Sequence, residues 1–211
     1  MCGNFSQKSK VEVLAKKYGI EKNLLFEPND DIYPWNDAYV VGQGKEGPGI
    51  SKMMWGLIPT WFKGSLSDAR KKFKFNFNAR GEELLEKASY KDPYQKGQRC
   101  ILFCDRFQEP FGGRTEKYDF YKKEKAEDDL LSIAALWNRW QDSKDNETYF
   151  SFTMVTSVAN FLVSEIHPKE RMPLLLDEDG VDIWMNPKSS INDCDALVKA
   201  CPDEILERIP V

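Results

Sequence analysis

Residues 99–107 read RCILFCDRF, a nearly continuous run of apolar side chains, and residues 149–156, YFSFTMVT, form a second one. Runs of this length and composition are typical of buried β-strands. Residues 118–121 and 130–135 predict two further strands, joined as a hairpin across the charged turn 122–129. Such strands, following one another along the chain, predict a mainly antiparallel sheet.

Shorter elements are predicted around these strands. Four prolines and several glycines surround the short apolar runs between residues 27 and 59, which indicates short strands linked by turns. Helices are expected over residues 10–18 behind a capping box at 9–12, just after Arg80 as far as residue 88, over 157–166, and around Ile183 and Leu197. We therefore expect a single α+β domain over residues 1–211, a mainly antiparallel sheet curling toward a barrel-like core with peripheral helices.

The composition describes an ordinary globular protein. Of 211 residues, 41% are hydrophobic and 30% are charged, and the net charge of −4 argues against a surface coated with positive charge. No apolar stretch approaches the ~20 residues that a membrane-spanning helix needs. The N-terminus lacks the apolar core of a secretory signal. The sequence thus predicts a cytoplasmic protein that does not cross a membrane.

The cysteines and the glycine patterns suggest no metal and no cofactor. Five cysteines are an odd number in a chain of this size, so free thiols are expected. Cys100 and Cys104 flank a strand-like run, and the chain has one histidine and no second cysteine pair at ligand spacing, which argues against zinc. Phosphate-binding loops and dinucleotide-binding glycine patterns are also lacking.

Charge is unevenly distributed along the chain. Residues 61–80 hold six basic residues and one acidic residue together with Trp61, Phe73, Phe75 and Phe77, whereas residues 177–211 hold nine acidic and three basic residues. Cations beside flat rings suit single-stranded nucleic acid, because the cations bind phosphates and the rings stack on bases. The alternative for residues 61–80 is a charged strand with a buried aromatic face.

Cys2 directly follows the initiator methionine, whose removal would leave a cysteine with a free α-amine. At reference pKa values of ~7.7–8.0 for the amine and ~8.5 for the thiol, free amine and thiolate coexist near neutral pH. Such a 1,2-aminothiol can condense with an aldehyde to an imine that the thiol closes into a thiazolidine. Alternatively the thiol attacks a carbonyl with the amine as its base. Judged by its position alone, Cys2 could equally be the second residue by chance, without a catalytic role.

Two further residues are candidates for acid and base catalysis. His167 is the only histidine, and its ordinary pKa predicts titration near neutral pH, so any histidine role in proton transfer belongs to it, although a single histidine is more often structural. Glu109 lies between aromatic residues at the end of an apolar strand, where loss of solvent would raise its pKa toward that of a useful general acid. Its alternative is a solvated surface carboxylate.

Six short motifs occur in a fixed order: Met1-Cys2-Gly3, Trp55-Gly56-Leu57-Ile58-Pro59, Asn78-Ala79-Arg80, Arg99-Cys100 with Glu109, Ala135-Leu136-Trp137, and His167 with Arg171-Met172-Pro173. In these motifs the chain resembles the SRAP family (SOS response-associated peptidase) over residues 2–187, leaving an acidic tail at 188–211. The resemblance implies the SRAP fold, binding to single-stranded DNA and covalent trapping of abasic sites. That is the aldehyde chemistry which the position of Cys2 suggests independently.

The resemblance also implies roles for individual residues. Cys2 would be the nucleophile that forms the thiazolidine, Asn78 would orient it and the sugar, and Arg80 would grip a neighbouring phosphate. Glu109 would assist ring opening and imine formation as an acid and base, and His167 would shuttle protons around the sugar hydroxyl. The positions that line the DNA channel in the family match Trp55, Thr156 and Arg171. The peptidase name implies removal of the residues ahead of the cysteine, here only Met1.

Three positions depart from the family pattern. Asn4 stands where the family usually has arginine after Cys-Gly, so one cation is missing from this DNA-binding position. Pro110 follows Glu109 where tryptophan is usual. The segment from His167 to Pro173 is two residues longer than the common pattern, which leaves the placement of Arg171 open.

The expected partner is single-stranded DNA with abasic sites, bound by a monomer without a cofactor. Whether the protein shields the lesion, releases it or cuts the strand as a lyase stays open. One alternative is a glutamine amidotransferase of the N-terminal-nucleophile class, which also begins Cys-Gly. Another is a non-catalytic module that binds single-stranded DNA through residues 61–80.

Overall fold

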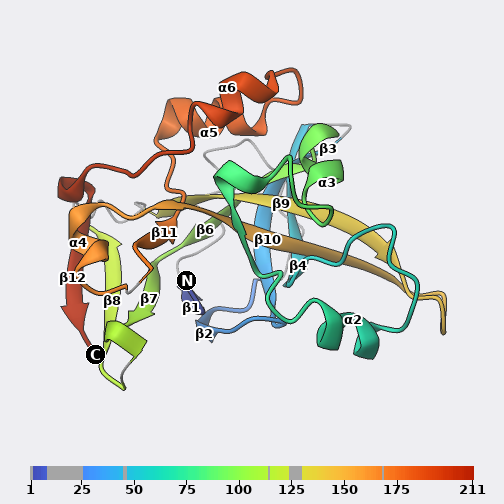
Figure 1. Cartoon of the computed structure of the whole chain (residues 1–211), viewed down its shortest axis with the longest axis horizontal. Coiled ribbons are helices and arrows are strands. Elements are labelled where there is room, and N and C mark those ends of the chain that lie inside the picture. The colour runs from blue at the N-terminus through green and yellow to red at the C-terminus, as the bar shows by residue number, and fades with distance from the viewer. Residues whose placement is uncertain (1, 9–25, 45–46, 114, 124–129, 168) are drawn as a thin grey trace.

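The computed structural model describes residues 2–8, 26–44, 47–113, 115–123, 130–167 and 169–211. Its strands form two sheets (Figure 1). The strands are β1 (Asn4–Gln7), β2 (Asn29–Ile32), β3 (Asp37–Gly44), β4 (Gly47–Trp55), β5 (Asn78–Arg80), β6 (Arg99–Cys104), β7 (Arg106–Pro110), β8 (Lys117–Lys122), β9 (Leu131–Gln141), β10 (Thr148–Val158), β11 (Arg171–Pro173) and β12 (Leu206–Pro210).

The larger sheet closes into a barrel. Its strands run in the order β11-β10-β4-β3-β6-β9, and β9 also pairs with β10, which joins the two ends of the path from β10 to β9. Antiparallel pairs predominate, while β4 and β5 lie parallel to β10. Closure leaves these strands with two partners and buries apolar side chains inside. The predicted α+β fold with a curled, mainly antiparallel sheet is confirmed.

The smaller sheet carries the N-terminus. Its order is β12-β8-β7-β1-β2, so β1 lies between β7 and β2 with Phe5 opposite Phe107. Apolar side chains from both sheets, among them Cys2, Phe5, Trp55 and Phe107, form one buried cluster. The first described residues, from Cys2 onward, are therefore fixed in the interior, near the middle of the molecule in Figure 1.

The predicted hairpin between residues 118–121 and 130–135 is wrong. Both strands exist, but β8 pairs with β7 and β12, whereas β9 pairs with β6 and β10 in the other sheet. β9 is buried along most of its length on both faces, and a barrel strand between two neighbours provides that burial. Strands that follow one another in sequence often pair, but not always. Here the burial of both faces of β9 favours a place between two barrel strands over a hairpin with β8.

The helices are short and lie at the periphery. They are α2 (Leu66–Lys72), α3 (Lys91–Gln95), α4 (Phe161–Ser164), α5 (Glu178–Met185) and α6 (Ile191–Asp195), with 3₁₀ turns η1 (Gly81–Glu83), η2 (Phe111–Gly113) and η3 (Asp203–Ile205). In Figure 1, α5 and α6 lie together at the top and α2 lies at the lower right.

Several helix predictions need correction. The expected helix after Arg80 is only the single turn η1, and the expected helix over 157–166 shrinks to α4, because β10 continues to Val158 and Asn160 caps the helix. A helix around Ile183 is confirmed as α5, whereas α6 ends before Leu197. The helix expected over 10–18 lies outside the described residues.

Among the described residues, no helix has the length and apolar character required to span a membrane.

Candidate active site around Cys2

Cys2 precedes β1 and is completely buried. Its thiol donates to the backbone oxygen of Asn4 at 3.3 Å. The side-chain amide of Asn78 donates to the backbone oxygen of Cys2 at 2.7 Å. Asn78 begins β5, which pairs with β10 opposite Met154. A strand distant in sequence thus holds the backbone of Cys2 through Asn78, whose role in orienting the cysteine and the sugar stays a prediction.

Glu109 and His167 meet beside Cys2. Glu109 lies in β7 and is completely buried, and its carboxylate oxygen Oε2 lies 3.7 Å from Nε2 of His167, which follows α4. Nδ1 of His167 accepts from the backbone N–H groups of Lys169 and Arg171, which leaves Nε2 directed toward the carboxyl group. The tertiary structure therefore brings together the acid and the only histidine.

Burial shifts both pKa values in opposite directions. It raises the pKa of Glu109 to about 7 and lowers the pKa of His167 to about 4, because the charged form of each loses solvation. At pH values between about 4 and about 7 both side chains are uncharged, so their contact is not an ion pair in that range. Glu109 can hold or accept a proton near neutral pH. The expectation that His167 also titrates near neutrality is wrong. At neutral pH its side chain is an uncharged imidazole.

The Cys2 thiol is protonated at neutral pH. Burial, and after it the nearby Glu109 carboxylate, raise its pKa well above the usual value, while backbone contacts with Asn4 and Gln108 act in the opposite sense. The thiolate fraction expected from reference values is therefore absent in this environment. Attack by sulfur requires a proton acceptor at the moment of reaction, and the nearby Glu109 carboxyl group, in its ionised form, can serve as that acceptor.

Arg171 belongs to the same region but faces inward. It pairs with Glu82 through Nη1 to Oε1 at 2.5 Å and Nη2 to Oε2 at 2.9 Å, and Nη2 also donates to the backbone oxygen of Thr156. Its side chain is 7% exposed. The longer segment after His167 thus still returns Arg171 to β10, where it lies opposite Val158.

The other candidate DNA contacts differ in exposure. Arg80 is a surface cation, 48% exposed, that pairs with Glu83 at 2.8 Å. Trp55 is completely buried, donates from its indole to the backbone oxygen of Phe77, and packs on Phe5. Asn4 is also buried. Contact of Trp55, Asn4, Thr156 and Arg171 with DNA stays a prediction, and in this structure these side chains serve the protein interior.

Only the last three residues of the basic and aromatic stretch 61–80 form a strand, β5. The stretch contains α2, whose N-terminus Ser65 caps in a capping box with Asp68. Lys72 lies 5.6 Å from the ring centre of Trp61 and Lys74 lies 4.7 Å from that of Phe75. Trp61 and Phe75 are exposed, whereas Phe73 is buried. The stretch therefore presents cations and rings together on the surface.

The cysteines are free, as expected, and Cys100 and Cys104 are buried in the core. No group of three or more metal-ligating side chains occurs within the described part of the chain.

Sequence reasoning missed two residues of this region, Glu82 and Arg106. Glu82 lies among several glutamates of similar local sequence, and Arg106 lies in a strand without a distinguishing motif. The sequence around each residue does not predict its role, because the partner of Glu82 is Arg171 and that of Arg106 is Asn4, both distant in sequence.

Glu82 gives a prediction about stability. The substitution Glu82→Gln removes the counter-charge of a buried guanidinium and should lower the free energy of unfolding by about 1–3 kcal/mol. Urea unfolding at pH 7 measures the change. Glu83→Gln is the matched control, because its partner Arg80 is exposed and such pairs contribute about 0–1 kcal/mol. Equal losses in the two variants would contradict a special role for the Glu82 pair.

Comparison with known proteins places the chain in a family. The family model of the SOS response associated peptidases (SRAP) matches residues 1–211, which includes the acidic tail. The chain belongs to the SRAP family. It is 30% identical over 195 residues to "Abasic site processing protein YoqW" of Bacillus subtilis, covering 90% of this chain and 82% of that protein.

A vertebrate protein and a crystal structure are similar too. "Abasic site processing protein HMCES" of Gallus gallus is 35% identical over an alignment of 156 residues, with 65% of this chain and 45% of that protein covered, so the chain spans less than half of that relative. A crystal structure of a Bacteroides thetaiotaomicron protein superposes with a TM-score of 0.89 at 25% identity, covering 100% of this chain and 92% of that chain.

Proposed function

We propose that this protein processes abasic sites in DNA, and that Cys2, once Met1 is removed, forms a covalent thiazolidine with the ring-opened sugar in single-stranded DNA. The observation that carries the proposal is the burial of Cys2 between Asn78, which holds its backbone oxygen, and Glu109, whose pKa is about 7. The names of the relatives YoqW and HMCES support the same substrate.

The reaction balances without an added reagent. The α-amine of Cys2 adds to the C1 aldehyde of the open sugar, and the resulting carbinolamine loses water to give an imine. The thiol then adds across the carbon–nitrogen double bond, forming the carbon–sulfur bond while its proton ends on nitrogen. The products are one thiazolidine and one water molecule, so acid and base catalysis is the main requirement.

Each site residue has a step in this sequence. Glu109, protonated at pH values below about 7, donates a proton during ring opening and to the departing hydroxyl of the carbinolamine. Neutral His167 carries its hydrogen on Nε2, because Nδ1 accepts backbone hydrogen bonds, and it donates through Nε2 to a sugar oxygen next to the carboxyl group. Asn78 fixes the cysteine backbone so that its amine and thiol reach the same carbon. Reversal of the thiazolidine and strand cleavage would both proceed from the same imine.

DNA binding is assigned to exposed cations and rings. Arg80 is exposed and immediately precedes η1, and Trp61 with Lys72 and Phe75 with Lys74 combine charge with stacking surfaces. A backbone cation and an aromatic platform together bind single strands with little sequence preference.

Replacing Arg80 by alanine should weaken non-covalent binding. Loss of one phosphate contact reduces the slope of log affinity against log salt by about one unit. Fluorescence anisotropy with a single-stranded oligonucleotide that lacks an abasic site measures this slope without a covalent step. Lys188→Ala, an exposed cation in the acidic tail, is the control and should leave the slope unchanged. An unchanged slope in Arg80→Ala would remove Arg80 from the DNA interface.

A denaturing gel tests the function itself. Purified protein, shown by intact mass to lack Met1, should shift a single-stranded oligonucleotide with one abasic site and leave the undamaged oligonucleotide unshifted. Glutamine hydrolysis without a DNA adduct would instead support an amidotransferase. Reversible binding without an adduct would support a non-catalytic module.

A further inference from the structure

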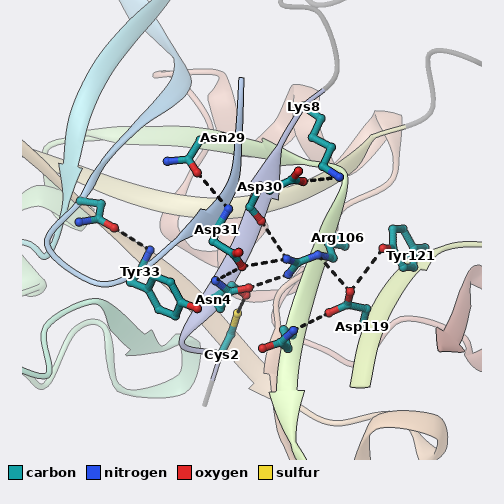
Figure 2. Close-up of polar contacts among 12 residues, drawn as sticks. Cys2, Asn4, Lys8, Asn29, Asp30, Asp31, Tyr33, Arg106, Asp119 and Tyr121 are labelled. Atoms are coloured by element: carbon teal, nitrogen blue, oxygen red, sulfur yellow. Dashed lines mark hydrogen bonds and ion pairs between the residues drawn. The ribbon is translucent and has the colours of Figure 1, made fainter. Parts of the chain in front are cut away.

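A polar cluster, buried except at Asp31, joins four strands next to Cys2. The Arg106 cluster, as we call it, consists of Asn4 in β1, Asp31 in β2, Arg106 in β7 and Asp119 in β8, and Figure 2 shows these side chains directed toward one another. Cys2 lies beside Asn4 in the same view.

Arg106 uses all three guanidinium nitrogens within the protein. Nη1 donates to Oδ1 of Asn4 at 2.6 Å, Nη2 contacts Oδ1 of Asp31 at 3.1 Å, and Nε contacts Oδ2 of Asp119 at 3.1 Å. Nη2 also donates to the backbone oxygen of Asp30. The side chain is 10% exposed. A guanidinium with this set of partners is a fixed structural fork, with no nitrogen directed to an external phosphate.

Asn4 is held at both ends of its side chain. Its Oδ1 accepts from Arg106, and its Nδ2 donates to Oδ1 of Asp31 at 3.1 Å. Its backbone oxygen accepts the hydrogen of the Cys2 thiol, and in the sheet Asn4 lies opposite Gln108, the neighbour of Glu109. The residue that receives the nucleophile's hydrogen bond is thus itself fixed by a buried cation.

The Arg106 cluster differs from apolar packing in what it contributes to the protein. Buried ion pairs contribute little net stability compared with apolar residues of the same volume, because the charges lose their hydration. Their fixed geometry does restrict the chain, and chain ends are otherwise the segments that fray most readily. A rigid anchor two residues after the nucleophile therefore limits the orientations open to Cys2.

On the basis of the proposed function, we propose that Arg106 is a positioning residue for the nucleophile, which holds Asn4 and through it aligns the Cys2 thiol between Asn78 and Glu109. Asn4 accordingly acts on Cys2 and not on DNA. Arg106 touches neither the sugar nor the phosphates in this assignment, so its loss changes the rate of the chemical step and leaves DNA affinity unchanged.

Two variants test the assignment. Asn4→Ala keeps every charge pair of the cluster, and Arg106→Lys keeps the charge but cannot reach Asn4, Asp31 and Asp119 together. Each should lower the rate of adduct formation at saturating abasic DNA by about 10- to 100-fold, as expected for a misplaced reacting group. The half-saturating DNA concentration should stay within about twofold of wild type.

The control is Lys8→Gln, which removes an exposed ion pair between Lys8, directly after β1, and Asp30 in β2, and should change neither quantity. A purely structural role predicts reduced activity only in proportion to unfolded protein, so thermal melting under assay conditions accompanies each rate. A changed half-saturating concentration with an unchanged maximal rate would overturn the proposal and make Asn4 a DNA contact.

Alkylation of Cys2 gives a readout that does not depend on DNA chemistry. Peptide mass mapping after brief treatment with iodoacetamide should show faster modification of Cys2 in both variants, because its buried thiol is no longer fixed, while Cys100 in the core stays protected. Absence of an adduct with wild-type protein would reject the proposed function alone. Equal alkylation rates in wild type and both variants would reject the positioning role of Arg106.

Discussion

Cys2→Ala should remove nearly all of the covalent DNA adduct, with non-covalent binding to single-stranded DNA retained. The alanine keeps the α-amine but removes the only atom that can close the five-membered ring, so the imine remains open to hydrolysis. In denaturing gels run without a reducing agent that traps imines, the shifted band should fall by a factor of about 100 or more, the scale at which loss of a covalent nucleophile is measured.

The matched control is Cys201→Ala, which removes a free thiol that is only partly buried and lies near the C-terminus. It should form the adduct at the wild-type rate. Borohydride treatment adds a second comparison, because it reduces an imine and should capture Cys2→Ala on DNA through its amine. An undiminished shift in Cys2→Ala without borohydride would exclude the thiazolidine mechanism.

Glu109→Gln should produce the second-largest effect, a decrease of about 10²–10⁴-fold in the maximal rate of adduct formation, the usual contribution of a positioned acid. In the wild type the rate should decline as pH rises through about 7, because Glu109 loses its proton there. The α-amine acts in the opposite direction, since its free fraction grows up to pH ~8. The variant should retain only the rising limb.

The measurement is a series of single-turnover rates between about pH 5.5 and about pH 9, which extends far enough below and above the Glu109 pKa of about 7 to resolve both limbs. Glu165→Gln, which alters an exposed carboxylate paired with Arg208, is the control and should reproduce the wild-type profile. Persistence of the declining limb in Glu109→Gln would assign that limb to another group.

The same substitution should stabilise the protein at alkaline pH. The pKa of Glu109 is higher in the folded state, about 7, than its ordinary value of 4.5. The contribution of the uncharged Glu109 side chain to stability is therefore fully present below pH 4.5 and is lost as pH rises through about 7. At pH 8 the variant avoids a buried carboxylate, and the gain should be on the order of 2–3 kcal/mol relative to pH 4.5.

The contribution of His167 to stability depends on pH in the opposite sense. Its pKa falls from 6.5 to about 4 on folding, so its contribution to stability is present above 6.5 and is lost as pH falls through 4. Urea unfolding of wild type and Glu109→Gln across this range separates the two groups, because the His167 component persists in the variant.

Motifs in the sequence identified the family, whereas local patterns predicted the sheet topology only in part. The order of Cys2, Asn78, Glu109 and His167 indicated the family, and the family model confirms membership over residues 1–211. A strand pairing that depends on distant partners was not predictable: residues 118–121 and 130–135 looked like a hairpin, yet β8 and β9 belong to different sheets. Local pattern cannot choose among several partners of similar hydrophobicity.

The electrostatic state of the site also escaped the sequence. Reference values predicted a partly ionised Cys2 thiol and a His167 that titrates near neutrality, whereas burial moves both pKa values away from that range. For Glu109 the aromatic surroundings did indicate an elevated pKa, because desolvation was visible in its own neighbours along the strand.

By itself the sequence determined which reactive groups this protein has, since a cysteine at position 2, one histidine and the Asn-Ala-Arg motif are properties of residue identity and order. Only the tertiary structure decided how those groups are held. The contact between Glu109 and His167, the pairing of Arg171 with Glu82, and the clamp of Arg106 on Asn4 each join residues far apart in the chain. Such contacts form only when the sheets close and solvent is excluded, and no local pattern encodes that step.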